Sequence, residues 1–200
     1  MKGKNITWHK SKISKQAREK SGKNKGAVIW LTGLPSSGKS TIAVELNALL
    51  AERGVNSYIL DGDNIRHGLN KDLGFSPQDR EENIRRISEV AKLFADSGFL
   101  VITAFISPYS KDRDRARNIL NKGDFIEVFI KADICVCAER DPKGLYKKAQ
   151  QGQIKEFTGV SAPYEEPENP ELVIDTEKLS KQKSAEYILR YLLQKTYVKA

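Results

Sequence analysis

Short apolar segments alternate with longer segments of helical periodicity along most of the chain. The short segments are rich in β-branched residues, which indicates buried strands at residues 27–32, 57–61, 99–106, 125–130 and 172–175. Between them, apolar positions recur every three or four residues, which predicts helices at 38–53, 79–97, 111–121, around 133–151 and 180–194. Such alternation is typical of a parallel sheet with helices on both faces. We therefore expect a three-layer α/β fold whose binding residues lie beyond the carboxyl ends of the strands.

The turn after the first predicted strand has the sequence of a phosphate-binding loop. Residues 33–40 read Gly-Leu-Pro-Ser-Ser-Gly-Lys-Ser and fit the pattern G-x-x-x-x-G-K-[ST]. Gly33 and Gly38 allow backbone angles that turn the N–H groups of the loop toward a polyphosphate. Lys39 can bring an ammonium to the β- and γ-phosphates, and Ser40 can offer a hydroxyl to Mg²⁺. The strand before this loop and the helix after it favour a P-loop NTPase-type fold over an ordinary glycine-rich turn.

Charged side chains follow the second predicted strand. Asp61 ends that strand, and Asp63 and Arg66 come directly after it. Because the carboxyl ends of parallel strands share one edge, we expect Asp61 near the phosphate loop. There it can hold Mg²⁺ through water or accept a proton from an attacking hydroxyl. For Asp63, a turn or helix cap is an equally good explanation.

The helix predicted at 79–97 carries two polar residues on its apolar face. Arg80 and Asn83 fall on the stripe that Ile84 and Ile87 continue. A guanidinium and an amide that face the core need a partner there. An anionic ligand at the edge of the sheet would supply one; the alternative is a buried ion pair for Arg80.

The basic excess of the chain is confined to its first 25 residues. The net charge is +8, yet residues 26–200 hold 25 basic and 25 acidic side chains, whereas residues 1–25 hold nine Lys or Arg and one acid. We interpret residues 1–25 as a solvated, partly disordered tail before a single domain at 26–200. Binding of nucleic acid or anionic lipid is the alternative for the tail. We interpret Arg113, Arg115 and Arg117 as a solvated basic face, and contacts with a phosphate are the alternative.

Other features of the sequence indicate an intracellular protein. Apolar runs stay below about 18 residues, so no membrane span is expected, and no secretory signal is recognised. Cys135 and Cys137 are too close for an ordinary disulfide and are interpreted as structural thiols of a reduced, cytoplasmic protein. Residues 152–170 contain three Pro and two Gly with little periodicity, which favours a long lid or binding loop.

Several motifs occur in an order that resembles the adenylylsulfate kinase (APS kinase) family. They are the phosphate loop and the segments 61–69, 74–86, 105–108, 141–148 and 157–159. The resemblance implies transfer of the γ-phosphate of ATP to the 3′-hydroxyl of adenosine 5′-phosphosulfate. The products would be ADP and 3′-phosphoadenosine 5′-phosphosulfate, the activated sulfate of sulfate assimilation. It also implies dependence on Mg²⁺, a homodimer and a mobile lid at about 141–170, with no nucleic-acid partner.

Carried over position by position, the resemblance assigns roles to particular side chains. The catalytic residues would be Lys39, Asp61 and Ser107, and Ser40 with Asp61 would hold the metal. ATP would be bound by Gly33, Leu34, Pro35, Ser36, Ser37, Gly38, Lys39, Ser40, Thr41, Arg140 and Lys143. Adenosine 5′-phosphosulfate would be bound by Asp63, Arg66, Phe75, Arg80, Asn83, Ile106, Ser107 and Phe157, with the two Phe rings on either side of its adenine.

The role of Ser107 and the class of function both have alternatives. Descriptions of the family include a phosphorylated intermediate at the serine that matches Ser107. No activating base accompanies Ser107 in the sequence, so direct in-line transfer is at least as well supported. The other functions are a different P-loop small-molecule or nucleotide kinase, a GTPase or nucleic-acid-dependent ATPase, and a non-catalytic nucleotide-binding module. An N-K-x-D match at 121–124 suggests the GTPase, but it precedes a predicted strand instead of following one.

Overall fold

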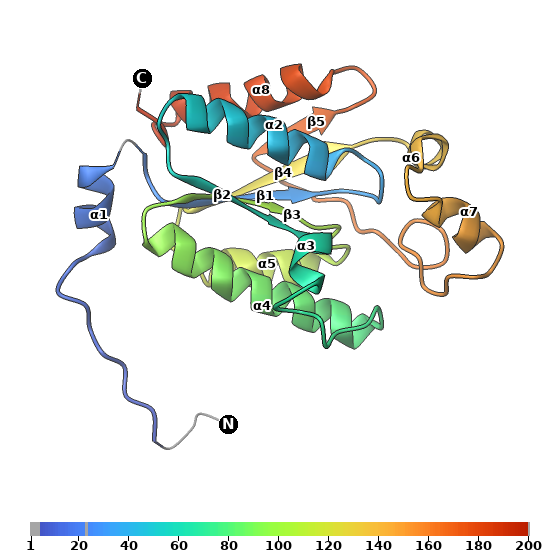
Figure 1. Ribbon diagram of the computed structural model, residues 1–200, viewed down its shortest axis with the longest axis horizontal. Coiled ribbons are helices and arrows are strands. Elements are labelled where there is room, and N and C mark those ends of the chain that lie inside the picture. The colour runs from blue at the N-terminus through green and yellow to red at the C-terminus, as the bar shows by residue number, and fades with distance from the viewer. Residues whose placement is uncertain (1–4, 23, 200) are drawn as a thin grey trace.

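The computed structural model describes residues 5–22 and 24–199, and a parallel sheet forms its centre (Figure 1). The strands are β1 (Ala27–Thr32), β2 (Ser57–Asp61), β3 (Leu100–Ala104), β4 (Phe125–Lys131) and β5 (Leu172–Asp175). They lie in the order β2-β3-β1-β4-β5, and each neighbouring pair is parallel. The predicted α/β fold with a parallel sheet is therefore confirmed. β3 is shorter than the predicted segment 99–106.

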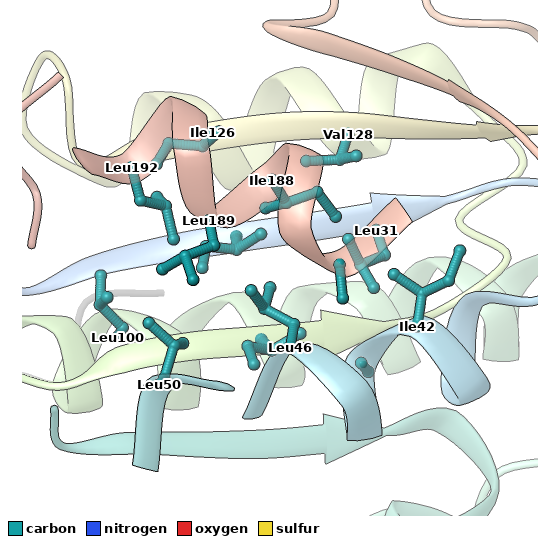
Figure 2. Packing of buried hydrophobic residues seen from close by; sticks show 14 of the residues in the cluster. Leu31, Ile42, Leu46, Leu50, Leu100, Ile126, Val128, Ile188, Leu189 and Leu192 are labelled. Carbon is teal, nitrogen blue, oxygen red and sulfur yellow. The ribbon is translucent and has the colours of Figure 1, made fainter. Parts of the chain in front are cut away.

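Helices cover both faces of the sheet. α2 (Lys39–Glu52) and α8 (Lys181–Gln194) lie on one face, and α4 (Pro77–Asp96) and α5 (Ser110–Asn118) lie on the other (Figure 1). Figure 2 shows the first interface, which includes Leu46, Leu50, Ile188, Leu189 and Leu192 of the helices and Leu31, Leu100, Ile126 and Val128 of the strands. Burial of each such side chain contributes about 1.5–3 kcal/mol. Alternate residues of β1 enter the two cores, so this central strand is buried along its whole length.

Two short helices replace the single helix predicted around 133–151. α6 (Ile134–Arg140) ends just before Pro142, and α7 (Leu145–Gln150) begins after it. Proline has no N–H to donate within a helix. Gly144 has a φ of +65°, an angle that favours glycine. The chain therefore turns between the helices, and Figure 1 shows both of them beyond the end of the sheet.

Part of the basic tail folds against the domain. α1 (Lys15–Ser21) starts at a cap from Ser14, whose hydroxyl accepts from the N–H of Ala17. Arg18 donates to the carboxylate of Asp96 at 2.7 Å. Residues 5–13 are exposed, whereas residues 1–4 and 23 lie outside the described part. Interpreting all of residues 1–25 as a solvated tail is therefore too broad, because acidic partners far along the chain hold α1.

A third, smaller core lies under α6 and α7. Cys137, Tyr146, Ala149 and Phe157 are buried in it. Both thiols are free, and the burial of Cys137 agrees with a structural role, whereas Cys135 is exposed and does not pack in the core as predicted. Among the described residues, no helix is long and apolar enough to cross a lipid bilayer.

Candidate active site

A cavity of about 1030 Å³ opens at the carboxyl edge of the sheet. Its walls come from the phosphate loop, the ends of β2 and β3, the start of α4 and the segments after α6 and β5. All the predicted site residues line it except Gly33, Leu34 and Phe157. The expectation that these residues gather beyond the carboxyl ends of the strands is therefore confirmed.

The phosphate loop depends on its glycines for space and for backbone angle. A Cβ on Gly33 would lie 2.4 Å from the carbonyl oxygen of Ile130, so only glycine fits there. Gly38 has a φ of +106° and stands directly before the first turn of α2. The free N–H groups at the start of α2 consequently face the cavity side of the loop, which is a suitable environment for an anion.

Lys39 lies buried at the base of the loop. Its Nζ donates to the carbonyl oxygens of Gly33 at 2.9 Å and Leu34 at 2.7 Å. Burial lowers the pKa of the Lys39 ammonium to about 8, although the Asp61 and Asp63 carboxylates act in the opposite direction. A polyphosphate next to Lys39 would favour the charged form again.

Ser40 and Asp61 meet at one side of the cavity. The Ser40 hydroxyl donates to Oδ2 of Asp61 at 2.6 Å. The other carboxylate oxygen accepts from the backbone N–H of Asp63 at 3.0 Å and so caps α3 (Gly62–Arg66), a short helix that we did not predict. A hydroxyl and a carboxylate are oxygen ligands of the kind that Mg²⁺ prefers, with water and phosphate oxygens completing its shell. These two residues therefore fit a magnesium ion held together with a polyphosphate.

Arginines and one amide form another part of the cavity wall, called the arginine wall below. The guanidinium of Arg66 lies 4.3 Å from the ring centre of Phe75 and donates to the carbonyls of Leu73 and Gly74. Arg80 donates through Nε to the carbonyl of Phe75 at 2.9 Å. No ion pair among the described residues includes Arg80, which argues against the buried ion pair considered above. Asn83 is buried, and its Oδ1 accepts from Asn70 at 2.9 Å.

The two aromatic residues predicted to enclose a base lie in different environments. Phe75 is 64% exposed on the wall of the cavity. Phe157 is buried, with its ring edge-on to Tyr146 at 5.0 Å between centroids. Arg80 links the two regions, because it also donates to the carbonyl of Glu156 and to the hydroxyl of Thr158. Phe157 therefore lies next in sequence to two residues that Arg80 contacts, but its ring is packed into the small core.

Two basic residues of the segment after α6 also reach the cavity. Lys143 pairs with Asp63, and both side chains are more than half exposed. Arg140 donates to Oγ1 of Thr176 at 2.9 Å and to its carbonyl at 2.8 Å. The Thr176 hydroxyl lies 3.0 Å from the carbonyl of Ser37 in the phosphate loop. Sequence reasoning missed Thr176, although its position directly after β5 could have indicated it.

Ser107 lies just after β3, as predicted, but the residues that contact it were not predicted. It has a φ of +40°, and its side chain is nearly inaccessible. Arg113, which we interpreted as part of a solvated face, is 2% exposed and pairs with Glu127 at 2.8 Å. Its Nη1 donates to the carbonyl of Ser107 at 2.8 Å. The interpretation of Arg113 was wrong because its counter-ion comes from β4, which no pattern within α5 reveals.

The N-K-x-D match at residues 121–124 lies outside this cavity. The side chains of Asn121 and Asp124 bond to each other at 2.9 Å in the turn that precedes β4. All strands are parallel, so this turn lies at the edge of the sheet opposite the phosphate loop. The match therefore cannot read a base bound beside Lys39, which argues further against the GTPase alternative.

Comparisons with known sequences all match one family. A family model described as adenylylsulphate kinase matches residues 25–175. An adenylyl-sulfate kinase of Staphylococcus carnosus is 58% identical over 192 residues, which are 96% of this chain and 96% of that protein. A probable adenylyl-sulfate kinase of Halalkalibacterium halodurans is also 58% identical, over 94% of this chain and 93% of that protein.

Solved structures show the same similarity. The APS kinase of Mycobacterium tuberculosis, in complex with AMPPNP and APS, superposes with a TM-score of 0.81 at 46% identity. The match covers 84% of this chain and 98% of that one. A gluconokinase of Sinorhizobium meliloti has a TM-score of 0.52 at 19% identity, which indicates a common fold alone.

Proposed function

Because the chain belongs to the adenylylsulfate kinase family and is an ATP-dependent adenylyl-sulfate kinase, we propose that its cavity holds both nucleotides of that reaction side by side. The γ-phosphate of ATP passes to the 3′-hydroxyl of adenosine 5′-phosphosulfate, which yields ADP and 3′-phosphoadenosine 5′-phosphosulfate for sulfate assimilation. The observation that carries the division of the cavity is its two unlike walls. One is a phosphate loop beside a Ser–Asp pair, and the other is a wall whose arginines, Arg66 and Arg80, form no ion pair with any residue that the structure describes.

ATP occupies the wall of the phosphate loop. The backbone from Gly33 to Thr41 surrounds its phosphates, and Lys39 moves from the loop carbonyls to the β- and γ-phosphates. Arg140, fixed by Thr176, lies beside the base. Lys143 leaves Asp63 and approaches the phosphates when the lid closes.

Ser40 and Asp61 are the residues that would hold Mg²⁺. When bound, this ion supplies neutralisation of the charge on the β- and γ-phosphate oxygens. Asp61 keeps the Ser40 hydroxyl and the first turn of α3 in place through its two oxygens. Its free lone pairs can also accept the proton that the attacking 3′-hydroxyl loses.

Adenosine 5′-phosphosulfate occupies the arginine wall. Arg66, Arg80 and Asn83 hold its phosphosulfate, because planar guanidinium groups suit an anion with several oxygens. Phe75 stacks on its adenine, and Phe157 reaches the other face of the base after leaving its contact with Tyr146. Asp63, Ile106 and Ser107 complete the lining.

Replacing Arg80 with alanine tests this division of the cavity. We expect the affinity for adenosine 5′-phosphosulfate to fall about ten- to over a hundredfold, since a charge-assisted contact is worth roughly 1.5–3 kcal/mol. The affinity for ATP should change little. Isothermal titration with each nucleotide measures both values. Arg85→Ala is the matched control, because Arg85 pairs with Glu82 on the exposed side of the same helix. A loss of ATP affinity with acceptor affinity intact would contradict the division.

We also propose that the lid predicted at about 141–170 moves only up to residue 162. Tyr164 bonds to Thr32 at 3.0 Å, and Glu165 accepts from the N–H of Ser110 at 2.7 Å, so the end of the segment is tied to the domain. We expect amide hydrogen exchange in 152–162 to slow when both nucleotides are bound. Residues 163–170 serve as the internal control and should exchange equally in both states. Exchange in 152–162 that ignores ligands would argue against a lid.

The proposed assembly is a cytoplasmic homodimer with no nucleic-acid or membrane partner. It rests on the family alone. Sedimentation of the full chain checks it, because a monomer has a mass of 22.5 kDa and a dimer twice that.

A further inference from the structure

Trp30 is the largest buried side chain of the central strand, and its indole N–H points at the cavity wall. The ring is fully buried between Phe105, at 6.3 Å between centroids, and Phe125, at 5.6 Å. An indole nitrogen can only donate, and a buried donor needs an acceptor. Here that acceptor is the hydroxyl oxygen of Ser107, at 3.0 Å.

The backbone of Ser107 is held as firmly as its side chain. A φ of +40° is unfavourable for a residue with a Cβ, so surrounding contacts must stabilise it. Arg113 donates to the Ser107 carbonyl at 2.8 Å, and the Thr32 hydroxyl donates to the carbonyl of Ile106 at 2.7 Å. Arg113 is itself fixed by the carboxylate of Glu127. These contacts make Ser107 a rigid part of the wall.

The contact with Trp30 also decides what the Ser107 hydroxyl can do. One lone pair of Oγ receives the indole N–H. In its other contact among the described residues, Oγ donates to the carbonyl of Phe105 at the limiting distance of 3.5 Å. No carboxylate, histidine or lysine of the described chain bonds to this hydroxyl, so an oxygen atom in the cavity can replace the distant Phe105 carbonyl as the acceptor of its proton.

We propose that Trp30 is a positioning residue for the acceptor nucleotide. Its N–H fixes the rotamer of Ser107, and the hydroxyl proton of Ser107 is thereby directed at an oxygen of the bound adenosine 5′-phosphosulfate. This inference rests on the proposed function, in which Ser107 belongs to the acceptor side.

A double-mutant cycle tests the inference through steady-state kinetics. Trp30→Phe should raise the KM for adenosine 5′-phosphosulfate about three- to tenfold, as the loss of one hydrogen bond predicts, with the KM for ATP changed less than about twofold. In a Ser107→Ala background, Trp30→Phe should add almost nothing, because its target is gone. Phe125→Leu is the matched control: it removes packing from the same ring stack, and Phe125 does not line the cavity.

The outcomes separate the inference from the proposed function. An unchanged acceptor KM in Ser107→Ala would remove Ser107 from the acceptor side. A raised KM in Ser107→Ala but not in Trp30→Phe would overturn the inference alone. The inference would also be overturned if Trp30→Phe raised the KM for adenosine 5′-phosphosulfate equally in the unaltered and the Ser107→Ala backgrounds. The same holds if Phe125→Leu raised this KM as much as Trp30→Phe does.

An NMR measurement covers the case in which Trp30→Phe does not fold. The chain has two tryptophans, and Trp8 is 87% exposed, so its indole N–H signal is an internal reference. Ser107→Ala should move the Trp30 signal and leave the Trp8 signal in place. In the unaltered protein, adenosine 5′-phosphosulfate with ADP should move the Trp30 signal more than ADP alone. A Trp30 signal that ignores both changes would overturn the inference.

Discussion

Replacing Lys39 with alanine will lower turnover by on the order of a hundredfold or more while the fold survives. The Lys39 ammonium is the cation held at the base of the phosphate loop, and its partners are loop carbonyls that a phosphate can replace. The substitution leaves no buried ion behind, because neither partner is charged. Turnover and circular dichroism of the purified variant measure the two effects. Lys92→Ala, at an exposed position of α4, is the control.

The lowered pKa of Lys39 adds a pH dependence to this prediction. The ammonium is charged below about pH 8 and neutral above it in the free protein. Binding of a polyphosphate favours the charged form, so ATP affinity should fall as pH rises through about 8. Lys39→Ala should lose this fall. A variant that kept normal turnover and the same pH profile would show that Lys39 does not contact the phosphates.

Replacing Asp61 with asparagine will lower turnover by a similar factor, on the order of a hundredfold or more. An asparagine can still accept from the N–H of Asp63 and bond to the Ser40 hydroxyl, so local structure should persist. The negative charge is lost, and the concentration of Mg²⁺ needed for half-maximal activity should rise. A magnesium titration of the ADP-release rate measures both changes.

Asp114→Asn is the matched control for this variant, because Asp114 is exposed on α5 and does not line the cavity. Its turnover and magnesium dependence should equal those of the unaltered chain. Near-normal turnover in a folded Asp61→Asn protein would remove Asp61 from the mechanism.

Local signals in the sequence were sufficient for the scaffold and for one side of the site. Periodicity and β-branched content depend only on near neighbours, and they located the five strands. The meeting of Ser40 with Asp61 followed from a topological rule, because the phosphate loop that leads to Ser40 follows β1, Asp61 ends β2, and both strands belong to one parallel sheet. The helical phase of α4 likewise placed Arg80 and Asn83 on the cavity wall.

Contacts between distant segments decided the rest. The carboxylate that buries Arg113 lies on β4, and the hydroxyl that receives the Trp30 N–H is 77 positions away. Phe157 has an aromatic ring that could stack on a base, yet it packs against Tyr146 in the small core. In each case the side chain has more than one favourable partner, and only the packed fold selects among them.

The sequence by itself therefore determined the fold class, the phosphate loop and the edge of the sheet at which chemistry occurs. These depend on backbone periodicity, on glycine geometry and on the direction of parallel strands, which are local or topological properties. The tertiary structure alone decided which charges are buried, which aromatic ring faces the cavity and which donor fixes Ser107. Burial and hydrogen bonding depend on the exact neighbours of a side chain, and these come from elements far apart along the chain.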